Sequence, residues 1–256
     1  MIPKIIHYVW IGSDMPETII ECIKSWKRLM PDYKYIHWDN SKIQNIDNLF
    51  LKQALAEKKW AFVADYVRLY AIYNYGGIYL DTDVYIYKSF DNLLSNPFFI
   101  GRENSIHITG GRSEIYLTSH CFGAEKGHSF IKKCLLYYDR PFIVSNNNDF
   151  PTSLRLNITI IPYILSEFAE QYGYNSRPLK KGIQHLRNEV IVYPSTYFDC
   201  TKVTKDSYCK HLAVGSWREK HSKTIKYNIK YKIKWRIIAL MQYILRKFNY
   251  IIVELD

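Results

Sequence analysis

The chain has 256 residues, of which 48% are hydrophobic and 16% aromatic, and this composition excludes an intrinsically disordered protein. Its length allows one large domain or two small ones. The formal net charge is +11, but ten of the 35 basic residues and one of the 24 acidic residues lie between Arg218 and Lys247, so this segment carries +9. The rest of the chain is nearly neutral and contains no recognised nucleic-acid-binding motif, which argues against a nucleic-acid partner.

The cysteines and the first residues indicate the cellular compartment. Five cysteines without a CxxC pair favour reduced thiols in the cytosol over a disulfide scaffold. The N-terminal residues have no basic region followed by a long apolar stretch, and no apolar run is long enough to cross a bilayer. We therefore expect a cytoplasmic protein.

The first predicted elements alternate between strand and helix. The pattern predicts a strand over Lys4–Trp10, a helix over Glu17–Arg28 and a strand over Tyr33–Trp38. This order predicts an α/β fold with parallel strands. A long apolar helix is predicted over Lys58–Tyr75, and the glycine pair that follows would end it.

The remaining predicted elements are shorter, and they lead into a basic amphipathic tail. In the tail, apolar residues first alternate with basic ones and then follow a helical period, so its secondary structure stays open. We divide the chain into a catalytic domain, residues 1–217, and this extension, residues 218–256. The other predictions are a strand near Pro97–Gly101, helices over Ser129–Tyr138 and Pro162–Tyr172, and strands over Val190–Tyr193 and His211–Val214.

The most informative segment follows the long apolar helix. A short apolar strand, Ile78–Leu80, is followed directly by Asp81 and Asp83. Carboxylates at alternate positions of a strand point to the same side, so both could reach one hard cation such as Mn²⁺ or Mg²⁺. Because Mg²⁺ is usually held by one or two carboxylates and substrate phosphates, this pattern predicts a nucleotide diphosphate site. The alternative is a solvated turn, since two acids one residue apart also occur by chance.

Asp65 and Arg68 are the only charges inside the long apolar helix, and they lie one turn apart on the same face. Burying both is costly unless they are paired. They could form an ion pair that serves the helix alone, or a polar cluster that holds sugar hydroxyls. Trp10 could stack on a nucleobase or belong to the core, and His211 carries little weight by itself.

These residues occur in four blocks that resemble the DXD-containing glycosyltransferases of family thirty-two, and more distantly the catalytic domains of the large clostridial glucosylating toxins. The resemblance covers about residues 1–217, and the second block is the most specific. The blocks are Pro3–Gly12; Ala64–Arg68 with Gly76–Asp83; Gly123–His128; and His211 with Gly215–Trp217.

The resemblance implies a GT-A type fold, which is a Rossmann-like mixed sheet flanked by helices. It also implies a metal-dependent, retaining transfer of a hexose from a nucleotide-sugar, with UDP favoured over GDP. The expected acceptor is a saccharide or a lipid-linked saccharide in cell-surface polysaccharide assembly.

The resemblance assigns one set of residues to the base and the sugar of the donor. Trp10 would stack on the base, with Val9 beside it in the nucleotide-binding set. Asp65 and Arg68 would hold the donor sugar, and Tyr79 would line the donor pocket.

A second set would bind the metal and the diphosphate. Asp83 would ligate Mn²⁺ or Mg²⁺ directly, and Asp81 would contact the ribose or a water on the metal. His211 would be a further protein ligand, and Ser216 and Trp217 would contact the diphosphate. Asp81 and Asp83, together with the helical pair, are the expected catalytic residues.

Two other interpretations remain. A metal-dependent nucleotidyltransferase would share the diphosphate site, but it would release pyrophosphate from a nucleoside triphosphate. A basic nucleic-acid- or membrane-binding protein without catalysis would depend on the tail. Each Lys or Arg near an anionic bilayer contributes about 1 kcal/mol, so the tail could anchor the protein peripherally to the inner face of the plasma membrane. The alternative for the tail is a solvated end.

Overall fold

The structure, a computed structural model, describes residues 1–146 and 151–215. Residues 1–107 and 113–215 belong to a first compact unit, and residues 108–112 are assigned to a second. The predicted domain boundary and the basic amphipathic tail lie outside the described residues. None of the helices in residues 1–146 and 151–215 is both long enough and apolar enough to cross a lipid bilayer.

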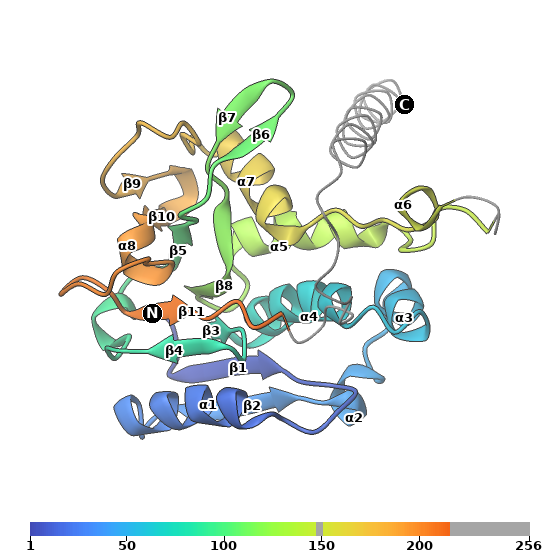
Figure 1. Ribbon diagram of the computed structural model, residues 1–256, viewed down its shortest axis with the longest axis horizontal. Helices are drawn as coiled ribbons and strands as arrows, with labels where there is room; N and C mark the ends of the chain where they lie inside the picture. Colours follow the sequence, from blue (N-terminus) through green and yellow to red (C-terminus); the bar gives the residue numbers. More distant parts are fainter. Residues whose placement is uncertain (147–150, 216–256) are drawn as a thin grey trace, which may run out of the picture. The chain divides into compact units, whose positions relative to one another are not determined.

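The first unit is built on a seven-stranded sheet with the order β2-β1-β3-β8-β5-β10-β9 (Figure 1). The pairs β1–β2, β1–β3 and β5–β10 are parallel, whereas β8 is antiparallel to both β3 and β5, and β9 is antiparallel to β10. The sheet is therefore mixed. Its strands are β1 (Ile5–Val9), β2 (Lys34–Trp38), β3 (Gly77–Leu80), β5 (Phe98–Arg102), β8 (Leu117–Ala124), β9 (Gln184–His185) and β10 (Val190–Tyr193).

Helices and two small sheets complete the described residues. The small sheets pair β4 (Val84–Ile86) with β11 (Cys209–His211), and β6 (His107–Thr109) with β7 (Arg112–Glu114). Short 3-10 turns cover Asp91–Leu93 (η1), Leu136–Asp139 (η2) and Arg187–Glu189 (η3). The α-helices are α1 (Glu17–Leu29), α2 (Asn40–Ile43), α3 (Leu49–Ala56), α4 (Trp60–Tyr75), α5 (Ser129–Leu135), α6 (Thr152–Arg155), α7 (Ile161–Gln171) and α8 (Ser195–Phe198).

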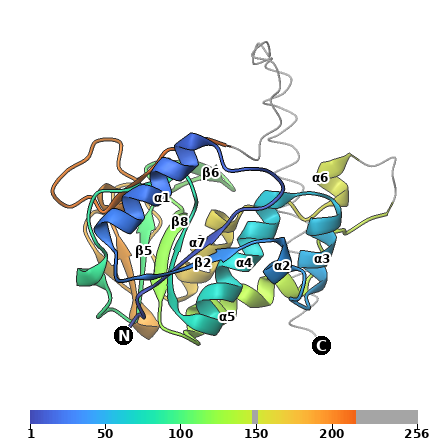
Figure 2. The same ribbon diagram turned by 90° about the horizontal axis from the view of Figure 1, so that it is seen from below.

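Side chains at alternate positions of the central strands pack into two separate hydrophobic cores. Tyr79 of β3 and Phe122 of β8 belong to the core under α3, α4, α5 and α7. Their neighbours Ile78, Leu80 and Cys121 belong to the core under α1. Successive side chains of a strand point to opposite faces, so the strands alternate between the two cores. Figures 1 and 2 show α1 on one side of these strands and α4 with α5 on the other.

A glycine pair connects α4 to β3. Gly76 and Gly77 have positive φ values of 67° and 106°, and a Cβ on Gly77 would lie 2.6 Å from the carbonyl oxygen of Ile5. No other residue fits there without strain. The Gly76 carbonyl lies 2.9 Å from Nε2 of the buried His7, whose Nδ1 accepts a hydrogen bond of 3.1 Å from Trp38. Nε2 must therefore carry the proton and donate it to Gly76.

The predicted fold class, an α/β fold with a mixed sheet flanked by helices, is confirmed. One strand prediction was displaced: the strand expected over His211–Val214 is β11, Cys209–His211. It ends early because Ala213 has a φ of 51°, which leaves the extended region. The antiparallel strand β8 was not predicted at all.

Candidate active site

The two aspartates of the DXD motif lie in a turn between β3 and β4, not on a strand. The Val84 N–H donates to the Asp81 carbonyl at 3.1 Å, which closes the turn, and the Asp81 N–H donates to the His120 carbonyl at 2.9 Å. Strand alternation was therefore the wrong reason for expecting the carboxylates to converge. The turn nevertheless brings both of them to one place.

Asp81, Asp83 and His211 each offer one ligand atom, and these atoms all lie within 4.8 Å of one another. His211 arrives there because β11 pairs antiparallel with β4, which sets it opposite Val84. Asp83 Oδ1 lies 3.1 Å from His211 Nε2, and Asp83 Oδ2 accepts the Val214 N–H at 2.9 Å. The end of β11 is thus held against the DXD turn by both side-chain and main-chain bonds.

This donor set fits a divalent cation. Carboxylates suit Mg²⁺ and Mn²⁺, and imidazole suits first-row transition metals, so the mixture favours an ion such as Mn²⁺. In an octahedral shell with bonds of about 2.1 Å, neighbouring ligands are about 3.0 Å apart. The 3.1 Å between Asp83 Oδ1 and His211 Nε2 matches that separation. Three protein ligands leave positions for phosphate oxygens and water.

The charges in this cluster support one another. Burial alone would lower the pKa of His211, but its hydrogen bond to Asp83 and the nearby carboxylates of Asp83 and Asp81 raise that pKa above its ordinary value. Burial opposes ionisation of Asp83, yet the bond to His211 and the Val214 N–H lower the pKa of Asp83 below its ordinary value. Asp83 is therefore ionised at neutral pH.

Arg68 of α4 joins the helix to the DXD turn. Its Nη2 lies 2.9 Å from Asp65 Oδ1, and its Nη1 lies 3.3 Å from Asp81 Oδ1. Nη1 also donates to the Ser119 carbonyl at 2.7 Å, and Nε donates to the Ala64 carbonyl at 3.2 Å. The ion pair of the helix is therefore not restricted to the helix, because the same guanidinium holds a DXD carboxylate.

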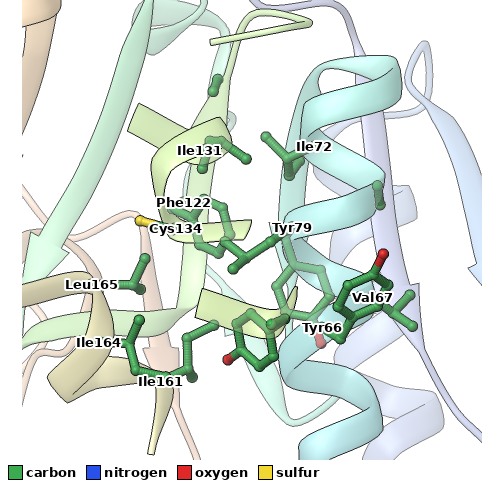
Figure 3. Packing of buried hydrophobic residues seen from close by; sticks show 14 of the residues in the cluster. Tyr66, Val67, Ile72, Tyr79, Phe122, Ile131, Cys134, Ile161, Ile164 and Leu165 are labelled. Atoms are coloured by element: carbon green, nitrogen blue, oxygen red, sulfur yellow. The ribbon is translucent and has the colours of Figure 1, made fainter. Parts of the chain in front are cut away.

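Tyr79 completes the buried side of the site. Its hydroxyl donates to Asp81 Oδ1 at 2.9 Å, and the Arg68 guanidinium carbon lies 4.7 Å from the centre of its ring. Burial and the nearby Asp81 raise the pKa of Asp65 to about 7, against the opposing effect of Arg68. Figure 3 shows Tyr79 within the apolar cluster that contains Tyr66 of α4 and Ile161 at the start of α7.

The predicted site residues thus have different positions. Ion pairs and a hydrogen bond link Asp65, Arg68, Tyr79 and Asp81. Asp83 is bonded to His211, and ligand atoms of these two residues lie within 4.8 Å of one of Asp81. Trp10 is half-buried just beyond the carboxyl end of β1, and its indole N–H donates to the Ser13 carbonyl at 2.7 Å. The Val9 side chain faces the core, so only its backbone is available to a nucleotide. Ser216 and Trp217 lie outside the described residues.

His120 was missed by the sequence analysis. Its ring is buried and stacks on His211, with ring centres 4.5 Å apart and planes 20° apart. Its Nε2 lies 3.0 Å from the Phe198 carbonyl, and its own carbonyl accepts the Asp81 N–H. A lone histidine carries no signal, but recognising β8 would have placed it beside β3.

The fold and this site together define a mixed α/β protein with a candidate divalent-cation site at the carboxyl edge of its sheet. Residues 16–99 match the family described as the glycosyltransferase sugar-binding region containing a DXD motif. The matched part includes both aspartates of the motif, Asp81 and Asp83.

The chain is also similar to two curated proteins and to one solved structure, each over a different share of its length. The chain is 34% identical over 134 residues to inositol phosphoceramide mannosyltransferase 3 of Schizosaccharomyces pombe, covering 51% of this chain and 35% of that protein. It is 28% identical over 151 residues to the mannosyl phosphorylinositol ceramide synthase SUR1 of Saccharomyces cerevisiae, covering 56% and 37%. The PaToxG glycosyltransferase structure is 21% identical, with coverages of 66% and 69% and a TM-score of 0.46. The chain spans little more than a third of the length of the two curated relatives.

Proposed function

We propose that this protein is a retaining, metal-dependent glycosyltransferase that moves a hexose from a nucleotide-sugar to a saccharide or lipid-linked saccharide. The observation that carries the proposal is the convergence of Asp81, Asp83 and His211 beside the buried pair Asp65–Arg68. A cation site next to a buried, charged polar cluster suits a ligand with a diphosphate at one end and a sugar at the other.

Asp83 and His211, with Asp81 beside them, would hold the divalent cation. When bound, such an ion neutralises charge on the diphosphate and so assists its departure as the leaving group. The turn and β11 hold Asp83 and His211 side by side, because Asp83 is bonded to both His211 and the Val214 N–H. To ligate the cation, His211 would give up its hydrogen bond to Asp83 and the proton on Nε2, since a ligating imidazole is neutral.

Asp65 and Arg68 would bind hydroxyl groups of the transferred sugar. Arg68 fixes the Asp65 carboxylate at 2.9 Å and so orients it for that role. The anomeric carbon gains positive charge as its bond to the phosphate oxygen breaks, and a nearby carboxylate offsets that charge. The acceptor hydroxyl oxygen would bond to the anomeric carbon on the same face, and its proton would pass to the departing phosphate oxygen. This route retains the configuration and needs no nucleophile from the protein.

We further propose UDP as the favoured nucleotide and a peripheral association of the basic tail with an anionic membrane. Two relatives are named for mannosyl transfer involving an inositol-containing ceramide, which supports testing mannose among the donors and lipid-linked acceptors. Flotation with vesicles containing phosphatidylserine, comparing the full chain with a chain ending at Trp217, tests the membrane proposal. Equal flotation of the two chains removes it.

The proposed function is tested by incubating the full chain with UDP-glucose, UDP-galactose or GDP-mannose, with Mn²⁺ or with EDTA. We expect release of the nucleoside diphosphate from one donor family, with Mn²⁺ and not with EDTA. Release of pyrophosphate from a nucleoside triphosphate, without turnover of any nucleotide-sugar, would instead indicate a nucleotidyltransferase.

A further inference from the structure

The hydroxyl of Tyr138, in η2, is buried without a hydrogen-bond partner. Within residues 1–146 and 151–215, only this atom and Nε of Arg155 are buried side-chain polar atoms of that kind. Tyr138 is 1% exposed. A buried hydroxyl without a partner loses its hydrogen bonds to water and gains none in return, which is why such groups are rare. This one therefore calls for an explanation.

The surrounding aromatic residues hold the Tyr138 ring in place. Phe50 and Tyr66 pack against it edge to face, with ring centres 4.8 Å and 5.9 Å away. Its main-chain carbonyl accepts a hydrogen bond of 3.1 Å from the Asn48 side chain. The ring cannot swing out to place its hydroxyl in water without disturbing the larger apolar core. The hydroxyl is fixed where it is.

The charged groups near this hydroxyl are those of the candidate donor-sugar site. Tyr138 packs against Tyr66 of α4, the residue that follows Asp65, and the nearby Asp65 raises the pKa of Tyr138 while Arg68 lowers it. Burial raises its pKa well above the ordinary value, so the group stays a neutral hydroxyl that can both donate and accept. A carboxylate acceptor, a guanidinium donor and a hydroxyl with both capacities are thus gathered in one region.

We propose that Tyr138 is a sugar-binding residue, whose hydroxyl pairs with a hydroxyl group of the hexose carried by the nucleotide-sugar. This inference rests on the proposed function. A sugar hydroxyl has the same dual donor and acceptor capacity as the orphaned phenol, so it supplies the partner that the protein does not. Because the Tyr138 hydroxyl is unpaired in the free protein, it gains a hydrogen bond only when the donor binds. Such a site discriminates against a sugar that lacks the matching hydroxyl.

Tyr138→Phe tests the proposal, because it removes only the hydroxyl and keeps the packed ring. The matched control is Tyr137→Phe on the neighbouring residue, whose hydroxyl already donates to Asn157 Oδ1 at 2.8 Å. In the full chain we expect Tyr138→Phe to leave the melting temperature unchanged or slightly raised, because no native hydrogen bond is lost. Tyr137→Phe should lower the melting temperature.

The decisive readout is the dissociation constant, measured by calorimetry with Mn²⁺, for UDP-glucose, UDP-galactose and GDP-mannose, and for UDP and GDP without a sugar. Tyr138→Phe should raise the dissociation constant of the donor roughly 2- to 10-fold, which corresponds to the loss of one hydrogen bond. The dissociation constant of the sugar-free nucleotide should stay unchanged. Tyr137→Phe should change neither.

Two results overturn the inference while leaving the proposed function intact. One is an unchanged affinity of Tyr138→Phe for the donor that the unmutated protein binds and hydrolyses. The other is that Tyr138→Phe loses affinity equally for the donor and the sugar-free nucleotide and also has a lowered melting temperature. This result would mean that the Tyr138 hydroxyl bonds to a structural water and not to the sugar. If the unmutated protein neither binds nor hydrolyses any of the three donors, the proposed function fails, and this inference fails with it.

Discussion

The two sides of the candidate site differ in how completely the protein satisfies their charges. On the inner side, the side chains of Arg68 and Asp65 are 5% and 10% exposed, and they bond to each other. On the outer side, the side chains of His211 and Asp83 are 28% and 14% exposed, and they bond to each other across one turn and one short strand. The inner charges are the more deeply enclosed of the two pairs, and the outer side chains are more open to solvent.

This difference separates folding from binding. An unpaired charge inside a core is costly, so changes on the inner side should act first on stability. Groups open to solvent add little to stability, so changes on the outer side should act on metal binding and turnover. Asp81 lies between the two sides, since it contacts Arg68 and also belongs to the cation cluster.

The largest expected effect is on the inner side, from Arg68→Met. The substitution leaves Asp65 and Asp81 without their shared cation, and breaking a buried ion pair in this way typically costs about 3–5 kcal/mol. We expect a large fall in the free energy of unfolding, measured by urea denaturation. The control Arg28→Met removes an exposed arginine and should change it by less than about 0.5 kcal/mol. Equal stability of the two variants would mean that Arg68 is not structural.

On the outer side, Asp83→Asn should reduce turnover instead of stability. The amide oxygen can still accept the Val214 N–H, but the charged metal ligand is lost. We expect nucleotide-sugar hydrolysis to fall on the order of 10²–10³-fold, the scale of losing one charge-stabilising group, with little change in melting temperature. The exposed Asp206→Asn is the control and should be fully active. If Asp83→Asn is as active as Asp206→Asn, the proposed role of Asp83 in turnover is wrong.

His7 extends the comparison to pH, because it supports the inner side through Gly76. Burial lowers the pKa of His7 to about 4, against an ordinary 6.5. Above pH 6.5 the folded and unfolded chains are both neutral at His7. Below it the unfolded chain takes up a proton first, so stability falls toward pH 4, by at most about 1.4 kcal/mol per pH unit.

His7→Asn removes this titration while the other groups titrate alike in both proteins. The measurement is the free energy of unfolding at pH 7.0, 6.0 and 5.0 for the two proteins. The difference in unfolding free energy between the unmutated protein and His7→Asn should become smaller as pH falls. A difference that does not change with pH would show that His7 titrates normally in the folded protein.

The smallest effect is expected at Tyr79, which joins the inner side to Asp81 by one hydrogen bond. Tyr79→Phe keeps the ring under Arg68 and removes only that bond, at a cost of about 1 kcal/mol in stability. Turnover should fall several-fold because Asp81 loses one of its two anchors. The half-exposed Tyr75→Phe serves as the control, and an equal response of the two variants would show that the Tyr79 hydroxyl does not position Asp81.

Much of the inner side was predictable because its signals are local. Glycines that end an apolar helix, and charges spaced one turn apart on that helix, indicate α4, β3 and the buried pair directly. The second partner of Arg68 could not be predicted, because its contact with Asp81 crosses from a helix to a turn.

The outer side depends on pairings between distant parts of the chain. His211 reaches Asp83 only because β11 pairs with β4, and His120 reaches His211 only through the unpredicted β8. Periodicity reports the type of an element and not its partner, so His211 could be assigned only through the family resemblance. Tyr138 shows the same limit, since the missing partner of a hydroxyl is visible only after packing is known.

The central claim is that Asp81, Asp83 and His211 bind a divalent cation that also binds the donor diphosphate. The most direct measurement is the anomalous difference density at the manganese edge in crystals grown with UDP and MnCl₂. The account predicts one manganese peak in contact with Asp83, His211 and the diphosphate. A bound diphosphate with manganese elsewhere, or manganese bound away from these three side chains, would contradict it.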